Sequence, residues 1–146
     1  MQDTLYRVSA TLLSSHHDRE DAIQECVLKA LSRRDSLRDD RAMQAWVVRI
    51  LINECRQLYR RRKREMPMDA LPEPEPAPDA DPEVFRALFS LDKRLRLPMV
   101  LYYADGYRVE EITKILRMPS GTVKSRLARG REALKKALSD ESRPEK

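Results

Sequence analysis

The chain has 146 residues, of which 36% are charged and 41% are hydrophobic, and its formal net charge is +5. No apolar run reaches the ~20 residues of a membrane span, and the N-terminus lacks the pattern of a secretory signal. Two cysteines are too few for a disulfide framework and have no metal-ligand spacing around them. We therefore expect a cytoplasmic, all-α protein with buried thiols, no cofactor, no metal, no membrane contact of its own and no enzymatic activity.

The charge is arranged in three blocks. Residues 1–65 carry 14 basic and 10 acidic groups, residues 66–83 carry six acidic groups and no basic one, and residues 84–146 carry 15 basic and 8 acidic groups. The middle block also holds six of the nine prolines, which disfavour helix. This pattern predicts two small helical domains, residues 1–65 and 84–146, that each meet a polyanion. A flexible acidic linker at residues 66–83 would join them.

Three helices are predicted in the first block. The first has one apolar face, which consists of Leu5, Val8, Leu12 and Leu13. The second follows Asp18, a plausible N-cap. Its apolar stripe consists of Ala22, Ile23, Cys26, Val27, Ala30 and Leu31. The third is expected at about residues 41–64.

The third helix ends in five consecutive cations, residues 60–64. Such a run is usually a solvated face. Here Trp46, Asn53 and Tyr59 lie on the same helix, and aromatic and amide groups can stack on bases or hydrogen-bond to them. Trp46 taken alone, on an apolar helix face, is more often a core residue.

The second block is also predicted to be helical. A short helix begins near Val84, and Asp92 caps the next one. Pro98 is expected to kink that helix or to mark the start of a 3₁₀ segment, and Gly106 is a natural helix stop.

Residues 109–131 have the pattern of a helix-turn-helix. Ile112, Ile115 and Leu116 would pack against Val123 and Leu127 across a break at residues 117–119. Ser120 or Thr122 could cap the second helix, which then presents a basic face suited to the major groove. A basic solvated helix in an ordinary bundle is the alternative.

Together these segments resemble an extracytoplasmic-function (ECF) sigma factor of the sigma-70 family. Residues 18–31 (DREDAIQECVLKAL) resemble region 2.2, and residues 46–56 (WVVRILINECR) resemble regions 2.3 and 2.4. Residues 106–112 (GYRVEEI) and 119–127 (PSGTVKSRL) resemble region 4. Arg108 departs from the pattern, because the family often has a Ser or Thr N-cap there.

The resemblance implies a role for each segment. The residues expected to bind core polymerase are Asp21, Gln24, Glu25 and Leu28. Those expected at the −10 element are Trp46, Arg49, Asn53, Arg56, Arg60 and Arg61. Those expected at the −35 element are Arg108, Thr122, Lys124, Ser125, Ala128 and Arg129.

The resemblance also implies partners. They are core RNA polymerase, through its β′ clamp helices and β flap, promoter DNA, and a separate anti-sigma factor. The acidic linker would thread through the polymerase along a path built for nucleic acid, or would be a simple tether. Two other functions stay open: a helix-turn-helix regulator that acts without polymerase, and a helical adaptor that binds acidic proteins.

Overall fold

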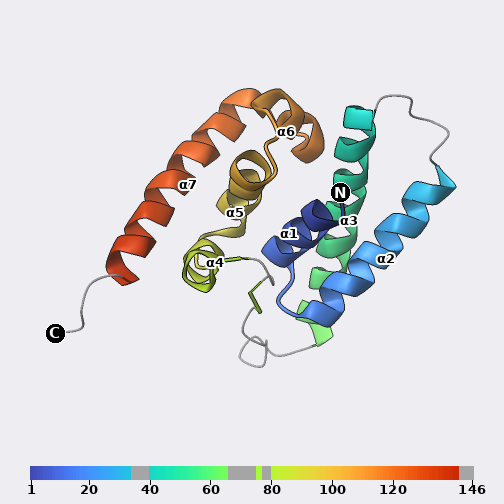
Figure 1. Ribbon diagram of the computed structural model, residues 1–146, viewed down its shortest axis with the longest axis horizontal. Coiled ribbons are helices and arrows are strands. Elements are labelled where there is room, and N and C mark those ends of the chain that lie inside the picture. The colour runs from blue at the N-terminus through green and yellow to red at the C-terminus, as the bar shows by residue number, and fades with distance from the viewer. Residues whose placement is uncertain (34–39, 66–74, 77–79, 142–146) are drawn as a thin grey trace.

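The computed structural model describes residues 1–33, 40–65, 75–76 and 80–141, and these residues form helices joined by short connections, with no strand (Figure 1). The elements are α1 (Gln2–Leu12), α2 (His16–Ser32), α3 (Asp40–Glu65), α4 (Pro82–Phe89), α5 (Lys93–Met99), the π-helical turn η3 (Val100–Ala104), α6 (Val109–Leu116) and α7 (Ser120–Glu141). The all-α prediction is confirmed.

Helices α1, α2 and α3 form a bundle in which α2 and α3 lie side by side (Figure 1). The inner faces of these helices are apolar and almost completely buried. Their buried members include Leu5, Val8, Leu12, Ala22, Cys26, Val48, Leu51, Ile52, Cys55 and Leu58. The two thiols are buried as predicted, and burial raises the pKa of Cys26 to about 11 and that of Cys55 to about 12.

The predicted N-cap of α2 was wrong. The helix begins at His16, and the Ser15 hydroxyl accepts a hydrogen bond from the Asp18 backbone N–H at 3.1 Å. The Asp18 carboxylate instead accepts hydrogen bonds from Arg62 at 2.9 and 3.2 Å. Ser and Asp are both favoured N-caps, so the pattern alone did not separate them.

The second half contains α4 to α7. Asp92 caps α5 as predicted, because its carboxylate accepts from the Arg94 backbone N–H. The helix widens into the π-turn η3 just after Pro98, whose ring nitrogen has no hydrogen to donate. Gly106, at φ 71°, then ends the helix in the left-handed conformation that glycine adopts without strain.

The two halves share one hydrophobic core. Helix α1 lies between α3 and α5 and contacts both as well as η3, while α6 packs against α3 (Figure 1). Leu97, Leu101 and Ile112 therefore belong to the same buried cluster as Leu5 and Val8. The prediction of a flexible linker at 66–83 falls mostly on residues 66–74 and 77–79, which lie outside the described residues. It stays a prediction, although α4 already begins at Pro82.

The core should respond strongly to a cavity at Ile112, which is 0% exposed in α6. We expect Ile112→Ala to lower the free energy of unfolding by about 2–5 kcal/mol, through lost apolar contact and an unfilled cavity. Urea denaturation followed by circular dichroism measures this loss. Leu28→Ala is the control, because Leu28 is 62% exposed and its truncation should change stability by less than about 0.5 kcal/mol. Equal losses in the two variants would contradict the packing described.

Candidate nucleic-acid interface

The outer face of α2 carries an exposed apolar strip with polar neighbours. Leu28 is 62% exposed, Gln24 and Glu25 are also exposed, and Asp21 is half-buried. Val27 and Leu31 belong to the predicted apolar stripe, but they are 40% and 57% exposed, so the stripe is not buried across its whole width. The signal was present in the sequence: the apolar stripe of this helix is wider than a single packed face can bury. Exposed leucines and a valine along one helix suit a protein partner.

At the basic end of α3, most of the cationic side chains are exposed to solvent and one forms an ion pair with α2. Arg60, Arg61, Lys63 and Arg64 are exposed. Arg62 instead turns toward α2, where its hydrogen bonds to Asp18 raise the pKa of its guanidinium. The cationic run is therefore a solvated surface interrupted by one internal ion pair.

The residues expected at the −10 element lie along α3 in two groups. Asn53, Arg56, Arg60 and Arg61 are exposed. Trp46 and Arg49 are half-buried, because they line a cavity of about 360 Å³ together with residues of α6. Arg49 Nη2 donates a hydrogen bond of 2.6 Å to the Lys114 carbonyl oxygen, so α6 covers this end of the face.

The helix-turn-helix is formed as predicted. Ile112, Ile115, Val123 and Leu127 are buried in one cluster. The chain turns at Arg117, which has a left-handed φ of 53°. The predicted side-chain cap by Ser120 or Thr122 is not among the hydrogen bonds of the described residues, and the Thr122 and Val123 amides donate to the Pro119 carbonyl oxygen as the first backbone bonds of α7.

The predicted −35 face of α7 is exposed to solvent. Lys124, Ala128 and Arg129 are exposed, and Thr122 and Ser125 are partly so. Arg129 Nη2 donates to the Ser125 hydroxyl at 2.9 Å, which holds the guanidinium along the helix. Basic groups and a small side chain thus share one face of a helix that fits the major groove.

Arg108 occupies the N-cap of α6, and its side chain has no acceptor for the free amides. The reverse half of a capping box is present, because the Glu111 carboxylate accepts a hydrogen bond from the Arg108 backbone N–H at 2.9 Å. The helix therefore retains one half of a capping box. The exposed Arg108 side chain approaches the same carboxylate, with its Nε 3.4 Å from Glu111 Oε1, and lines the cavity that holds Trp46 and Arg49.

Several polar contacts join the halves, and we call three of them the clasp. Arg41 binds both carboxylate oxygens of Glu111, at 2.6 and 2.8 Å. Arg7 donates two hydrogen bonds to Asp105, whose side chain is 1% exposed. The bond from Arg49 to the Lys114 carbonyl is the third. None of these contacts could be expected from sequence spacing, since each joins residues at least 65 positions apart.

The clasp changes the titration of Glu111. Hydrogen bonding to Arg41 lowers the pKa of this carboxyl from 4.5 to about 2. Because the pKa is depressed in the packed state, the carboxylate contributes its full stabilisation above pH 4.5. That contribution is lost as the pH falls toward 2.

The described residues contain neither a candidate metal-binding cluster nor a candidate membrane-spanning helix. Within residues 1–33, 40–65, 75–76 and 80–141, no group of three or more His, Cys, Asp or Glu side chains is arranged to hold a metal ion. No helix in this part of the chain is long and apolar enough to cross a membrane.

Comparison with known proteins gives consistent matches. The family model for sigma-70 region 2 matches residues 1–65, and the model for sigma-70 region 4 matches residues 83–134. The chain is 30% identical to the ECF RNA polymerase sigma factor SigW of Bacillus subtilis, over 95% of this chain and 85% of that protein. It is 34% identical to the ECF RNA polymerase sigma-E factor of Escherichia coli, over 80% of this chain and 72% of that protein.

A solved structure has a similar fold. The sigma factor RpoE of Bartonella quintana, crystallised with the anti-sigma factor NepR, superposes with a TM-score of 0.80 at 30% identity. The match covers 92% of this chain and 89% of that one. CnrH, in complex with the cytosolic domain of CnrY, gives a TM-score of 0.73 at 26% identity over 97% and 84% of the two chains.

The clasp predicts that Glu111→Gln shifts the protein toward an open arrangement. Glutamine keeps the shape of the side chain but loses the charge that Arg41 binds. We expect a shift of about 1 kcal/mol, or about fivefold in the open population, as for a partly exposed ion pair. Small-angle X-ray scattering would show a larger radius of gyration. Glu110→Gln, an exposed neighbour on the same helix, is the matched control, and equal scattering from both variants would contradict the role of the clasp.

Proposed function

Because the chain belongs to the ECF group of sigma-70 family RNA polymerase sigma factors, we propose that its exposed faces divide promoter-specific initiation among three helices. Helix α2 binds core polymerase, α3 engages the −10 element, and α7 reads the −35 element. The observation that carries this division is that each helix exposes the chemistry its role requires. The face of α2 is apolar with an acidic rim, and those of α3 and α7 are cationic.

The face of α2 suits a helical protein partner such as the β′ clamp helices. Leu28 lies at its centre, flanked by the exposed Val27 and Leu31. Asp21, Gln24 and Glu25 surround the strip and supply polar rim contacts, the usual anatomy of a protein interface. Val27 and Leu31 therefore join the four residues expected from the sequence.

The exposed face of α3 suits a melted strand. Asn53, Arg56 and Arg60 recur at helical spacing on the same face, so an amide and two guanidiniums can contact base edges and phosphates in succession. Melting would come from capture of unpaired bases, with the cost met by stacking and ionic contacts. The chain thus acts as a non-catalytic subunit in the cytoplasm.

Promoter binding requires the clasp to open. Taken from their names, the −10 and −35 elements are about 25 base pairs apart, or roughly 85 Å at ~3.4 Å per pair, whereas α3, the longest of the described helices, spans only ~39 Å. Residues 66–81 can extend over at most ~55 Å, which allows the halves to separate far enough. Opening would also uncover Trp46 and Arg49 for the −10 strand. Polymerase would hold the open form in two ways. Its β flap would bind the second half, and its channel would take up the acidic linker of this chain.

A separate regulatory protein would act by controlling the separation of the two halves. Two structural neighbours are complexes of a sigma factor with an anti-sigma factor or a cytosolic domain. An anti-sigma factor that binds both halves of this chain would keep them from reaching the two elements together.

Transcription with purified core polymerase tests the proposal. The protein should direct core polymerase to start at specific sites, found by mapping transcripts after overexpression. Failure to bind core polymerase together with tight binding to duplex DNA would instead support a helix-turn-helix regulator. Failure to bind either would support an adaptor.

Core binding should depend on Leu28. We expect Leu28→Ala to weaken binding to core polymerase roughly tenfold, because an apolar anchor is lost from the centre of the interface. Fluorescence anisotropy with labelled protein measures this. Val84→Ala truncates another exposed apolar side chain, 43% exposed on α4, and should leave the affinity unchanged. The assignment of α2 fails if both variants bind core as tightly as the wild type.

Recognition of the −35 element should depend on Lys124 and Arg129. The double variant Lys124→Ala/Arg129→Ala should lose at least tenfold in transcription from a promoter that requires this element, because two contacts of about 1 kcal/mol or more are removed. Core binding should remain intact. The control Lys135→Ala/Lys136→Ala removes two exposed cations farther along α7 and should retain activity. A loss of core binding in the first variant would show that the face was wrongly assigned.

A further inference from the structure

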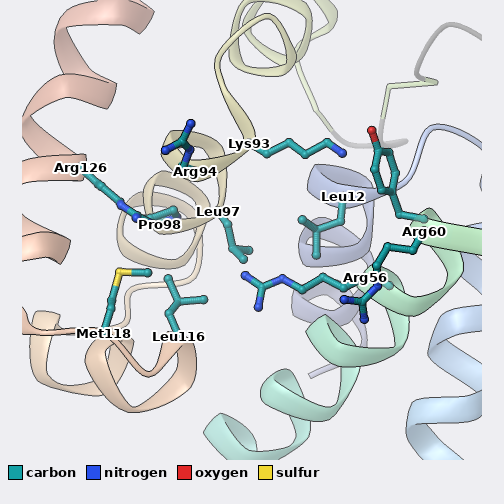
Figure 2. Close-up of a pocket in the computed structure, with 12 residues that line it drawn as sticks. Leu12, Arg56, Arg60, Lys93, Arg94, Leu97, Pro98, Leu116, Met118 and Arg126 are labelled. Carbon is teal, nitrogen blue, oxygen red and sulfur yellow. The ribbon is translucent and has the colours of Figure 1, made fainter. Parts of the chain in front are cut away.

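A cleft of about 280 Å³ lies between the two halves of the packed chain, and we call it the interhalf cleft. Figure 2 shows Arg56 reaching from α3 across the cleft, with Arg60 beside it, and Lys93 reaching back from α5. Arg126 of α7 and Arg94 of α5 complete the cationic lining. Five cationic residues from both halves therefore line one cleft.

These charges are poorly neutralised by the described residues. No aspartate or glutamate is among the described residues that line the interhalf cleft. Within the described chain, Arg94 approaches Asp92 at 3.5 Å, whereas Arg56, Arg60 and Arg126 form no ion pair. Lys93 Nζ lies 2.8 Å from the centre of the Tyr59 ring rather than against a carboxylate. Cations gathered without counter-charge form an anion-binding site.

A buried guanidinium adds positive charge near Lys93 and Tyr59. Arg96 is 5% exposed and stacks on Phe89 at 4.0 Å, and its Nε and Nη1 have no hydrogen-bond partner among the described residues. Burial lowers the pKa of Lys93, and the charge of Arg96 lowers it further. A bound anion would relieve this repulsion and favour the charged form of the lysine.

The rest of the interhalf cleft is apolar. Leu12, Leu97, Pro98, Leu116 and Met118 line it beside the cations (Figure 2). The volume is close to the lower limit of ~300 Å³ for small-molecule sites. A compact ligand with phosphate groups at one end and an apolar or aromatic body at the other would match both surfaces.

We propose that the interhalf cleft binds a compact phosphate-bearing anion, with a nucleoside diphosphate as the best fit, and that this ligand bridges the two halves. Arg56 and Arg60 contribute cations from the first half, and Lys93, Arg94 and Arg126 contribute them from the second. The site is complete only in the packed arrangement. Ligand binding therefore favours the closed form and competes with the use of Arg56 and Arg60 at the promoter.

Isothermal titration calorimetry on the full chain tests this, with pyrophosphate, GDP and guanosine as probes at constant ionic strength. We expect one saturable site for pyrophosphate and for GDP, and none for guanosine. Tighter binding of GDP than of pyrophosphate would show that the apolar wall holds a base. Equal binding would identify diphosphate alone as the ligand chemistry.

Variants distinguish a specific phosphate site from non-specific attraction of anions to a basic protein. Lys93→Ala/Arg126→Ala should weaken pyrophosphate binding at least tenfold, while Lys135→Ala/Lys136→Ala removes the same charge elsewhere and should change it less than twofold. Arg94→Ala, at an exposed side chain, serves if the first variant is unstable, with an expected loss of several-fold. Glu111→Gln keeps all five cations but should bind more weakly once scattering shows it to be open.

Three results would overturn the proposal. They are no saturable binding of either phosphate probe, equal losses in the cleft variant and the control, and unchanged affinity in an open variant. Because polymerase is absent from the titration, any of these results leaves the sigma-factor assignment intact.

Discussion

The packed arrangement depends on helix α1, whose second half is buried at every position from Val8 to Leu12. Leu5, Val8 and Leu12 fill the bundle with α2 and α3, while Ala10 packs with Phe85 of α4 in a second cluster. A short helix in this position cannot bury its whole apolar surface against one half alone. Its burial therefore places α5 and η3 against the first half. The clasp and the interhalf cleft follow from this placement, because they form where the surfaces around α1 meet.

Prediction from sequence succeeded where the signal was local. Periodicity located the helices, and Asp92, Gly106 and the break near Arg117 marked their ends, because caps and turns depend on a few adjacent residues. It failed where two local solutions were equivalent, as with Ser15 and Asp18 at the start of α2. Nothing in the spacing of Arg41 and Glu111 reveals their pairing, since ion pairs between distant segments depend on the tertiary arrangement. The site residues themselves were suggested by resemblance, and the structure adds which of them are exposed.

In the proposed function, the same side chains serve two arrangements of the chain. Arg49 bonds to a backbone carbonyl of α6, and Trp46 lines the cavity beside it, although both belong to the face expected at the −10 element. A surface built to attract phosphate must be kept from binding nucleic acid indiscriminately, because such attraction is largely independent of sequence. Covering part of it with the other DNA-binding half weakens both halves at once. Recognition of two elements then begins with a competition inside the molecule.

The short chain between α3 and α4 determines how strong that competition must be. Residues 66–81 tether the halves, so their encounter is intramolecular and occurs at an effective concentration on the order of millimolar. Contacts that would be too weak to join two separate proteins are then sufficient to populate the closed form. A few partly exposed ion pairs and a shared apolar edge meet this requirement, and polymerase can still separate them at modest cost. When polymerase releases the chain, reclosure needs no partner and does not depend on protein concentration.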